Sequence, residues 1–248
     1  MNKTLKRILI GFAVVIGLFI LTAVGFGLKM KSEVKNMHVI ETKELVQHVF
    51  AVKNSFVNMF LLKDSDNYIA IDAGADEKVI KEELKKLKID TAKVIAVFLT
   101  HGDGDHTAAL SVFSNAKVYL SRDEEQMING KTAKMMFMHN SISRKDYNLV
   151  DDGQKITIAK TLITCISTPG HTPGSMSYLL NDTYLFVGDA FGLKDGKVDK
   201  PNSIFSKDMP LAIQSFQKIN NLPTAEYIFT AHSGFTSDYK NAVKTVLK

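Results

Sequence analysis

The chain has 248 residues, one cysteine and a formal net charge of +5. This charge belongs to the N-terminal end, because residues 1–35 carry six basic side chains and one acidic one, whereas the remaining residues carry 25 of each sign. A body without net charge disfavours nucleic-acid binding, which needs a cationic face to attract phosphates. The single cysteine, Cys165, excludes an internal disulfide framework and a cysteine-rich zinc finger.

The N-terminal end predicts a membrane anchor. Residues 8–28 are 21 residues without a charged side chain, and as a helix this run measures about 31 Å, which matches the hydrocarbon core of a bilayer. A cleaved secretory signal is the alternative, but Gly25-Phe26-Gly27 is a poor cleavage site. We expect residues 1–7 to be a basic flank, residues 8–28 a transmembrane helix and residues 29–44 a linker. First spans commonly leave the N-terminus inside, so we expect the body, residues 45–248, outside the cytoplasmic membrane.

The body alternates between predicted strands and helices. β-Branched and aromatic residues predict strands over Val46–Val52, Ser55–Leu62 and Asn67–Ile71. Apolar residues at helical spacing predict a helix over Asp76–Leu87, and a continuous apolar run predicts a buried strand over Val94–Leu99. The other expected elements are a helix over His106–Phe113, a strand over Lys117–Leu120, a helix and loop over 122–147, strands over Lys155–Ile158 and Thr161–Ser167, a hairpin of Ser177–Leu180 with Tyr184–Val187, a helix over Pro210–Ile219, a strand over Tyr227–Phe229 and a helix over Ser237–Leu247. Two β-rich halves with interspersed helices indicate an α/β sandwich.

Four side chains that can bind a metal fall within six residues, directly after the expected strand Val94–Leu99. They are His101, Asp103, Asp105 and His106. Glycines between them let the backbone turn tightly and bring the side chains together. Histidine nitrogens and carboxylate oxygens suit Zn²⁺, and a larger share of carboxylate favours Mn²⁺ or Fe²⁺. The alternative, a solvated polar loop, rarely concentrates such residues in this way.

Three later positions repeat the pattern of a ligand-type residue just after a predicted strand. They are His171, in the turn-rich stretch 168–175, Asp189, after Tyr184–Val187, and His232, after Tyr227–Phe229. Each residue alone is compatible with an ordinary surface turn. Together with the cluster above, they predict one metal site at the strand ends.

This combination resembles the metallo-β-lactamase superfamily, whose usual pattern is His-x-His-x-Asp-His followed by single His, Asp and His ligands. The resemblance covers about residues 45–245 and includes Ile71-Asp72-Ala73-Gly74, which is similar to the early Asp-x-Gly turn of that family. It implies an αββα sandwich with the site at the edges of the two sheets. Residues 45–248 would then be a metallo-hydrolase domain behind one transmembrane helix.

The resemblance also implies two divalent ions, most readily Zn²⁺. One ion would use His101, position 103 and His171, the other Asp105, His106 and His232, and Asp189 would bridge both. Position 103 departs from the family because Asp103 stands where a histidine is usual, which leaves Mn²⁺ or Fe²⁺ open. Asp105 would be catalytic, as a ligand that also orients the attacking water. Such water ionises near neutral pH because the ion lowers its pKa.

The leading interpretation is a membrane-anchored, metal-dependent hydrolase of a small ester, thioester, lactone or phosphoester. The alternatives are a non-catalytic metal-binding sensor or scaffold at the membrane, and a β-lactam hydrolase. Glyoxalase II activity is disfavoured, because only 16 residues follow His232 and the added helical domain of that enzyme needs more. The expected partners are a small-molecule substrate and the membrane; the sequence gives no oligomeric state.

Several further residues carry weaker expectations. Asp72 and Thr100 are candidates for positioning the ligands. Phe191 is a candidate substrate contact, and the apolar stretch Lys134–Met138 is either a lid over the site or packing surface. The remaining histidines and the cysteine are expected to be structural or surface residues: His38, His48, His139 and Cys165.

Overall fold

The computed structural model describes residues 2–134, 138–222 and 225–244. The chain divides into two compact units, Met1–Met37 and His38–Lys248. The first unit holds one long helix, and the second holds the sheets and the candidate site.

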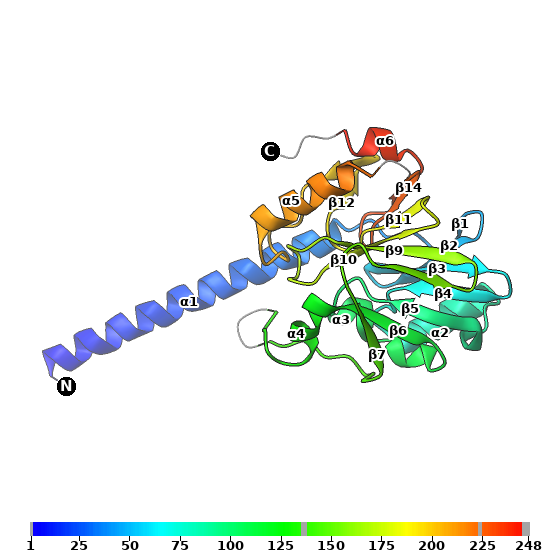
Figure 1. Cartoon of the computed structure of the whole chain (residues 1–248). Helices are drawn as coiled ribbons and strands as arrows, with labels where there is room; N and C mark the ends of the chain where they lie inside the picture. Colours follow the sequence, from blue (N-terminus) through cyan, green and yellow to red (C-terminus); the bar gives the residue numbers. More distant parts are fainter. Residues whose placement is uncertain (1, 135–137, 223–224, 245–248) are drawn as a thin grey trace. The chain divides into compact units, whose positions relative to one another are not determined.

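Helix α1 (Lys3–Lys35) is the helix of the first unit (Figure 1). Asn2 caps its start, since its side-chain oxygen accepts a hydrogen bond from the backbone N–H of Thr4 at 3.1 Å. The helix is long and apolar enough to cross a membrane, and large apolar side chains such as Phe19 and Leu28 are exposed. It continues past the expected span because no glycine or proline follows Leu28 before its end, so the first part of the expected linker is helical.

The second unit contains two large β-sheets and one small hairpin. The first sheet has the strand order β1 (Lys43–Val46), β2 (Val49–Asn54), β3 (Val57–Asp64), β4 (Asn67–Ile71), β5 (Val94–Phe98), β6 (Lys117–Ser121) and β7 (Tyr147–Val150). The second has the order β15 (Phe235–Thr236), β14 (Tyr227–Phe229), β11 (Tyr184–Phe186), β10 (Met176–Leu180), β9 (Thr161–Ser167) and β8 (Lys155–Ile158). Strands β12 (Gly192–Lys194) and β13 (Lys197–Asp199) form the hairpin.

Helices cover the outer faces of the two sheets (Figure 1). They are α2 (Glu77–Lys86), α3 (Gly104–Thr107), α4 (Glu125–Ile128), α5 (Met209–Asn220) and α6 (Tyr239–Ala242), with short 3₁₀ turns η1 (Thr91–Lys93), η2 (Leu110–Phe113) and η3 (Arg122–Glu124). Three apolar clusters separate the layers. One joins the first sheet to α2 through residues such as Leu61 and Ile80, and a second fills the space between the sheets, where Phe60 packs 5.4 Å from Phe186. The third joins the second sheet to Phe216 of α5, so the expected αββα sandwich is confirmed.

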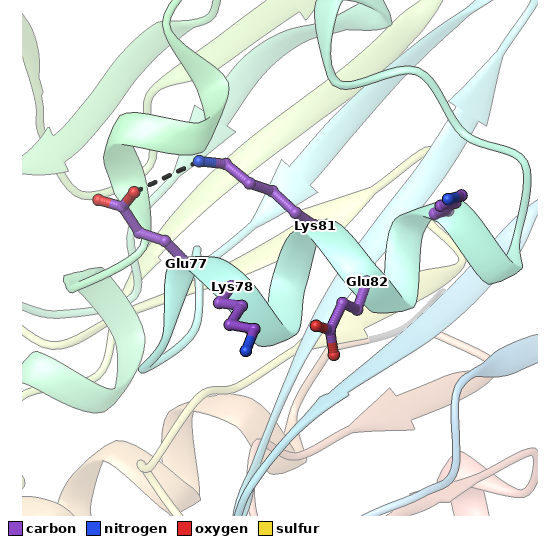
Figure 2. Close-up of a pocket in the computed structure, with 5 residues that line it drawn as sticks. Glu77, Lys78, Lys81 and Glu82 are labelled. Atoms are coloured by element: carbon purple, nitrogen blue, oxygen red, sulfur yellow. Dashed lines mark ion pairs between the residues drawn. The ribbon is translucent and has the colours of Figure 1, made fainter.

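Helix α2 shows how the sequence pattern produces this packing. Asp76 caps its start by accepting a backbone N–H at 3.0 Å, and Ile80 and Leu84 are buried against the first sheet. Figure 2 shows a pocket on its other face, lined by Glu77, Lys78, Lys81, Glu82 and Lys85. The Glu77–Lys81 ion pair there spans 3.6 Å with both side chains exposed, and such pairs contribute little to stability. The charged residues therefore form the solvent-facing side of an amphipathic helix.

The helix expected over His106–Phe113 is instead split into α3 and η2. The carbonyl oxygen of His106 accepts the N–H of Ala73 at 2.7 Å, and the N–H of Ala109 donates to the carbonyl of Gly74 at 3.0 Å. Backbone groups that would continue an α-helix are thus bonded to the turn after β4. These tertiary contacts override the helical pattern. They hold the turn after β4 against the segment that follows β5 and carries His101 to His106.

Several short elements differ from the sequence expectations. Strand β7, the β12–β13 hairpin and β15 were not expected, and each is a short strand at a sheet edge or outside the main sheets. The expected closing helix is shorter, because α6 ends at Ala242, and residues 245–247 of the expected helix lie outside the described residues. The hairpin of β10 with β11 is confirmed, with Asn181 and Asp182 both at positive φ in its turn.

Candidate metal centre

Every expected ligand lies just past the end of a strand, either in a loop or, for Asp105 and His106, in the short helix α3. His101, Asp103, Asp105 and His106 follow β5, His171 follows β9, Asp189 follows β11 and His232 follows β14. Strand β5 belongs to the first sheet and the other three belong to the second. The loops meet where the two sheets end, and all seven side chains come together there.

His101, Asp103 and His171 form the first group, with ligand atoms within 4.8 Å of one another. Oδ2 of Asp103 lies 3.5 Å from Nε2 of His101 and 3.1 Å from Nε2 of His171. Both histidines are buried, and the side chain of Asp103 is 16% exposed. Two imidazoles and a carboxylate are a set of donors that Zn²⁺ accepts.

Asp105, His106 and His232 form the second group, again with ligand atoms within 4.8 Å of one another. Oδ2 of Asp105 lies 3.6 Å from Nε2 of His106 and 3.4 Å from Nε2 of His232. The group has the same donor chemistry as the first, two imidazoles and one carboxylate.

Asp189 lies between the two groups. Its Oδ1 is 3.3 Å from Nε2 of His106 and 3.2 Å from Nε2 of His232, and its Oδ2 is 3.6 Å from Nε2 of His171. One carboxylate oxygen therefore faces the second group and the other faces the first. This is the placement that a bridging ligand requires.

Three buried atoms of the centre make no hydrogen bond within the described residues: Nε2 of His101, Nε2 of His106 and Oδ1 of Asp189. Leaving a buried polar atom without a partner costs about 1–3 kcal/mol, so such atoms are rare without a reason. All three belong to one cluster of ligand-type groups, His101–His106–Asp189. The residues present therefore fit one or more divalent ions.

Asp72 fixes the orientation of the segment after β5, from Thr100 to His106. It is buried, has a positive φ of 61°, and its Oδ1 accepts the N–H of Thr100 at 2.7 Å. Its Oδ2 lies 2.8 Å from Nδ1 of His106. A hydrogen bond to the outer nitrogen of a histidine directs the inner nitrogen toward the site, so both positioning roles expected for Asp72 and Thr100 have a structural basis.

The outer nitrogens of two other histidines are also held. Nδ1 of His101 lies 3.1 Å from Oγ1 of Thr100, and Nδ1 of His232 lies 2.6 Å from the carbonyl oxygen of Phe56. The Phe56 ring stacks on that of His232 at 5.9 Å between centroids. Phe56, in the turn between β2 and β3, was missed because nothing local in the sequence connects it to the site.

Glu124 is a second residue that sequence reasoning missed. Fully buried, it accepts the N–H of Gly102 at 2.8 Å, the hydroxyl of Thr172 at 2.6 Å and the N–H of Gly174 at 3.1 Å. Burial raises its pKa, although the nearby His101 lowers it. One carboxylate thus connects the loop after β5 to the turn that carries His171.

Opposite charges in the centre shift the pKa of several of its groups. Burial raises the pKa of Asp189, but His232, His106 and His171 together hold it well below its ordinary value. Burial lowers the pKa of His232, but Asp189 and Asp105 raise it to about 10. The pKa of His106 is likewise raised well above its ordinary value by the carboxylates around it, against the effect of burial. The carboxylates therefore favour a positive charge beside them, which either an imidazolium or a bound ion can supply.

Lys134 also reaches the centre. Its Nζ lies 2.6 Å from Oδ2 of Asp103 and 3.0 Å from Nε2 of His171, and its side chain is 15% exposed. Asn140 donates from Nδ2 to the other oxygen of Asp103 at 2.6 Å. Lys134 belongs to the apolar stretch expected as a lid or packing surface, of which residues 135–137, including Met135, Met136 and Phe137, lie outside the described residues. Met138 is 62% exposed.

Phe191 is not at the centre. It is 3% exposed and packs edge-on against Phe216 at 5.7 Å, in the core between the second sheet and α5, so the expected substrate contact is wrong. Cys165 is buried in the core between the sheets, and burial raises its pKa to about 12, as expected of an inert thiol. The histidines outside the motif, His38, His48 and His139, are all exposed.

The comparison with protein families identifies the superfamily. Residues 52–232 match the model of the metallo-beta-lactamase superfamily. The chain belongs to this superfamily. The match spans every expected ligand from His101 to His232, and it confirms the resemblance seen in the sequence.

Individual relatives share about 30% of their residues with the chain. The chain is 31% identical over 156 residues to the uncharacterized protein YobT of Bacillus subtilis, covering 56% of this chain and 64% of the relative. It is 30% identical over 178 residues to a hydroxyacylglutathione hydrolase of Cronobacter sakazakii, covering 71% of this chain and 61% of the relative. The chain thus spans just under two thirds of the length of these curated relatives.

The solved structures support the fold alone. A metallo-beta-lactamase family protein of Thermus thermophilus superposes with a TM-score of 0.62 at 17% identity, covering 81% of this chain and 78% of that protein. At such identity the likeness gives the sandwich architecture and no substrate.

Proposed function

We propose that the chain is a metal-dependent hydrolase that is anchored in a membrane by α1. The observation that carries this proposal is the arrangement of two imidazoles and a carboxylate on each side of Asp189, with buried atoms of His101, His106 and Asp189 that have no hydrogen-bond partner within the described residues. Membership of the superfamily supports a hydrolase, in which ions at these positions would be divalent and most readily Zn²⁺. The carboxylate Asp103 leaves Mn²⁺ or Fe²⁺ open.

Two metal positions follow from the two groups. The first would be held by His101, Asp103 and His171, the second by Asp105, His106 and His232, and Asp189 would serve both. A bound ion would supply Lewis acidity and lower the pKa of water near neutrality. No serine or cysteine nucleophile is required for that chemistry.

Asp105 would act as the catalytic residue of the chain. Its Oδ2 lies close to both His106 and His232, so the carboxylate is fixed by two imidazoles. Its side chain is 22% exposed, more than any other member of the ligand set. A carboxylate that is fixed yet reaches solvent can accept a proton from an attacking water and orient it toward a substrate.

The substrate would be a small ester, thioester, lactone or phosphoester. The similarity to hydroxyacylglutathione hydrolases makes a thioester the first compound class to examine. A β-lactam is a further candidate because the fold is shared with solved metallo-beta-lactamases. The non-catalytic alternative, a metal-binding sensor or scaffold, requires only the ions and no turnover.

The test is a substrate panel with elemental analysis on the same sample. The full chain, purified in detergent, is assayed with thioesters, esters, lactones, β-lactams and phosphodiesters, and its bound metal is counted. We expect stoichiometric metal and turnover in at least one class. Bound metal without turnover across the panel would favour the sensor or scaffold.

Two substitutions assign the activity to the centre. His106→Ala and Asp189→Ala are each expected to lose bound metal and to reduce hydrolysis at least about a hundredfold, because a ligand is removed from a buried centre. His139→Ala and Asp66→Ala remove the same types of side chain at exposed positions and should keep both properties. Full metal content and activity in the first pair would refute the assignment.

A further inference from the structure

Lys134 lies against two of the three atoms that form the first metal group. Its ammonium is 2.6 Å from Oδ2 of Asp103 and 3.0 Å from Nε2 of His171. An ammonium only donates hydrogen bonds, so Nε2 of His171 must accept with its lone pair. A metal ion would bind that same lone pair and that same carboxylate oxygen.

The ammonium and a metal ion would therefore compete for the same atoms. An ion about 2 Å from Oδ2 of Asp103 would lie less than about 5 Å from the ammonium, at which distance the positive charges repel strongly in a buried site.

The backbone of Lys134 is held in place by Lys207. Nζ of Lys207 donates to the carbonyl oxygens of Ala133 at 2.6 Å and of Lys134 at 3.2 Å. The N–H of Lys207 in turn donates to the carbonyl of His171 at 3.2 Å. Lys207 thus connects the backbone of Lys134 to the turn of a ligand, and the long side chain of Lys134 extends from this anchored point to Asp103.

Among the described residues, no lysine or arginine reaches the second group. The ion pairs of Asp105 within the described residues are to His106 and His232, and Asp189 pairs with these two and with His171. No lysine or arginine among the described residues forms an ion pair with either carboxylate. The two metal positions therefore differ in their intrinsic competition.

We propose that Lys134 is a built-in competitor for the first metal position, so that divalent ions load the second position first and fill the first only when the Lys134 side chain moves away. This inference rests on the proposed metal centre. The two ligand groups have the same donor chemistry, but the second position would bind an ion tightly and the first would bind one only after Lys134 leaves. The departure at position 103 has a physical counterpart in this competition, since the extra carboxylate charge of Asp103 is matched by Lys134.

The test counts ions rather than turnover. The full chain in detergent is depleted with a chelator and titrated with Zn²⁺ against a chromophoric competitor. For the natural chain we expect two resolved steps, with the second ion bound at least about tenfold more weakly than the first. Lys134→Met keeps an unbranched side chain, shorter by one atom, and removes its charge, so its second step should tighten by about tenfold or more while the first is unchanged.

Two further variants separate charge from packing. Lys134→Arg keeps a cation and should retain the weak second step. Lys131→Met removes the same charge three residues earlier, at an exposed position, and should behave like the natural chain. Melting curves of the chelated proteins check that all variants fold.

The outcomes are distinct. An unchanged second step in Lys134→Met, or two equal steps in the natural chain, would overturn the competition. Absence of tight Zn²⁺ in every variant would overturn the metal centre itself and this inference with it. Two tight ions combined with no turnover on the substrate panel would refute the hydrolase and the competition together, whereas stepwise loading without turnover would refute the hydrolase alone.

Discussion

Asp72, whose backbone lies in the left-handed region, has a specific role near the centre. Asp72 has a φ of 61° and is buried; this left-handed conformation costs free energy for most residues, but aspartate and asparagine adopt it more readily than most. In return, its carboxylate holds the backbone and the hydroxyl of Thr100 and the imidazole of His106. The left-handed turn therefore occurs at the residue that orients His106.

Asp72→Asn tests this role. Asparagine tolerates the same backbone conformation, so the fold should persist, while loss of the negative charge weakens the hold on His106. We expect Zn²⁺ affinity at the tight position to fall about 10- to 100-fold, measured by competition with a chelator. Asp66→Asn, at an exposed turn, is the control. Equal affinities in the two variants would show that Asp72 does not position His106.

At the scale of elements, the turn that carries His171 is packed against the 3₁₀ turn η3 too closely to allow any side chain at Gly174. A Cβ at this position would lie 2.0 Å from the backbone nitrogen of Glu124. Glu124 connects this turn to Gly102 in the loop after β5. The close approach therefore sets the separation of His171 from the other ligands.

Gly174→Ala should destabilise the chain by about 1–3 kcal/mol or more, since the clash is with backbone that cannot rotate away. It should also lower metal content by displacing His171. Gly104→Ala is a matched control in the other ligand loop, because a Cβ there meets nothing within 4 Å and its φ is not positive. Chemical unfolding of both variants measures the difference. A Gly174→Ala chain as stable as Gly104→Ala would contradict the packing argument.

The sequence predicted elements whose pattern is local. Asp76–Leu87 was located to within one residue at each end because its cap and apolar spacing are both in the sequence. The seven candidate ligands stand out because they are concentrated just after predicted strands, and the structure brings them together. The short strand β7 lacks such a signal, since pairing with β6 forms it. The contacts of Glu124, Lys134 and Phe56 with the centre were not predicted for the same reason. Their proximity to the centre exists only once the sheets have folded.

At the scale of the whole molecule, the chain combines a neutral folded body with a basic, apolar helix. Clusters of lysine and arginine beside a span favour contact with anionic lipid headgroups. This distribution, together with the length of α1, is the basis for proposing a single span with the body outside the cytoplasmic membrane.

Membrane fractionation tests the anchor. The full chain should remain in membranes washed with alkaline carbonate, whereas a variant with Ile16→Arg and Ile20→Arg should be released, because each arginine at the centre of a span costs about 2.5–3.5 kcal/mol. Protease added to intact spheroplasts should digest the body. A mature mass lacking the first residues would indicate a cleaved signal, and protection from protease would place the body inside.

The placement of the candidate ligands on both sheets has a consequence for folding. The ligands come from loops of both sheets, and His101 and His232 are separated by more than half of the chain, so no partly folded fragment contains a complete centre. Long-range contacts of this kind form late in folding, after the loop-closure entropy has been overcome. Metal would therefore bind only to chains in which both sheets have docked, and by mass action it would draw the population toward them. Metal supply would then influence how much of the chain reaches the folded state.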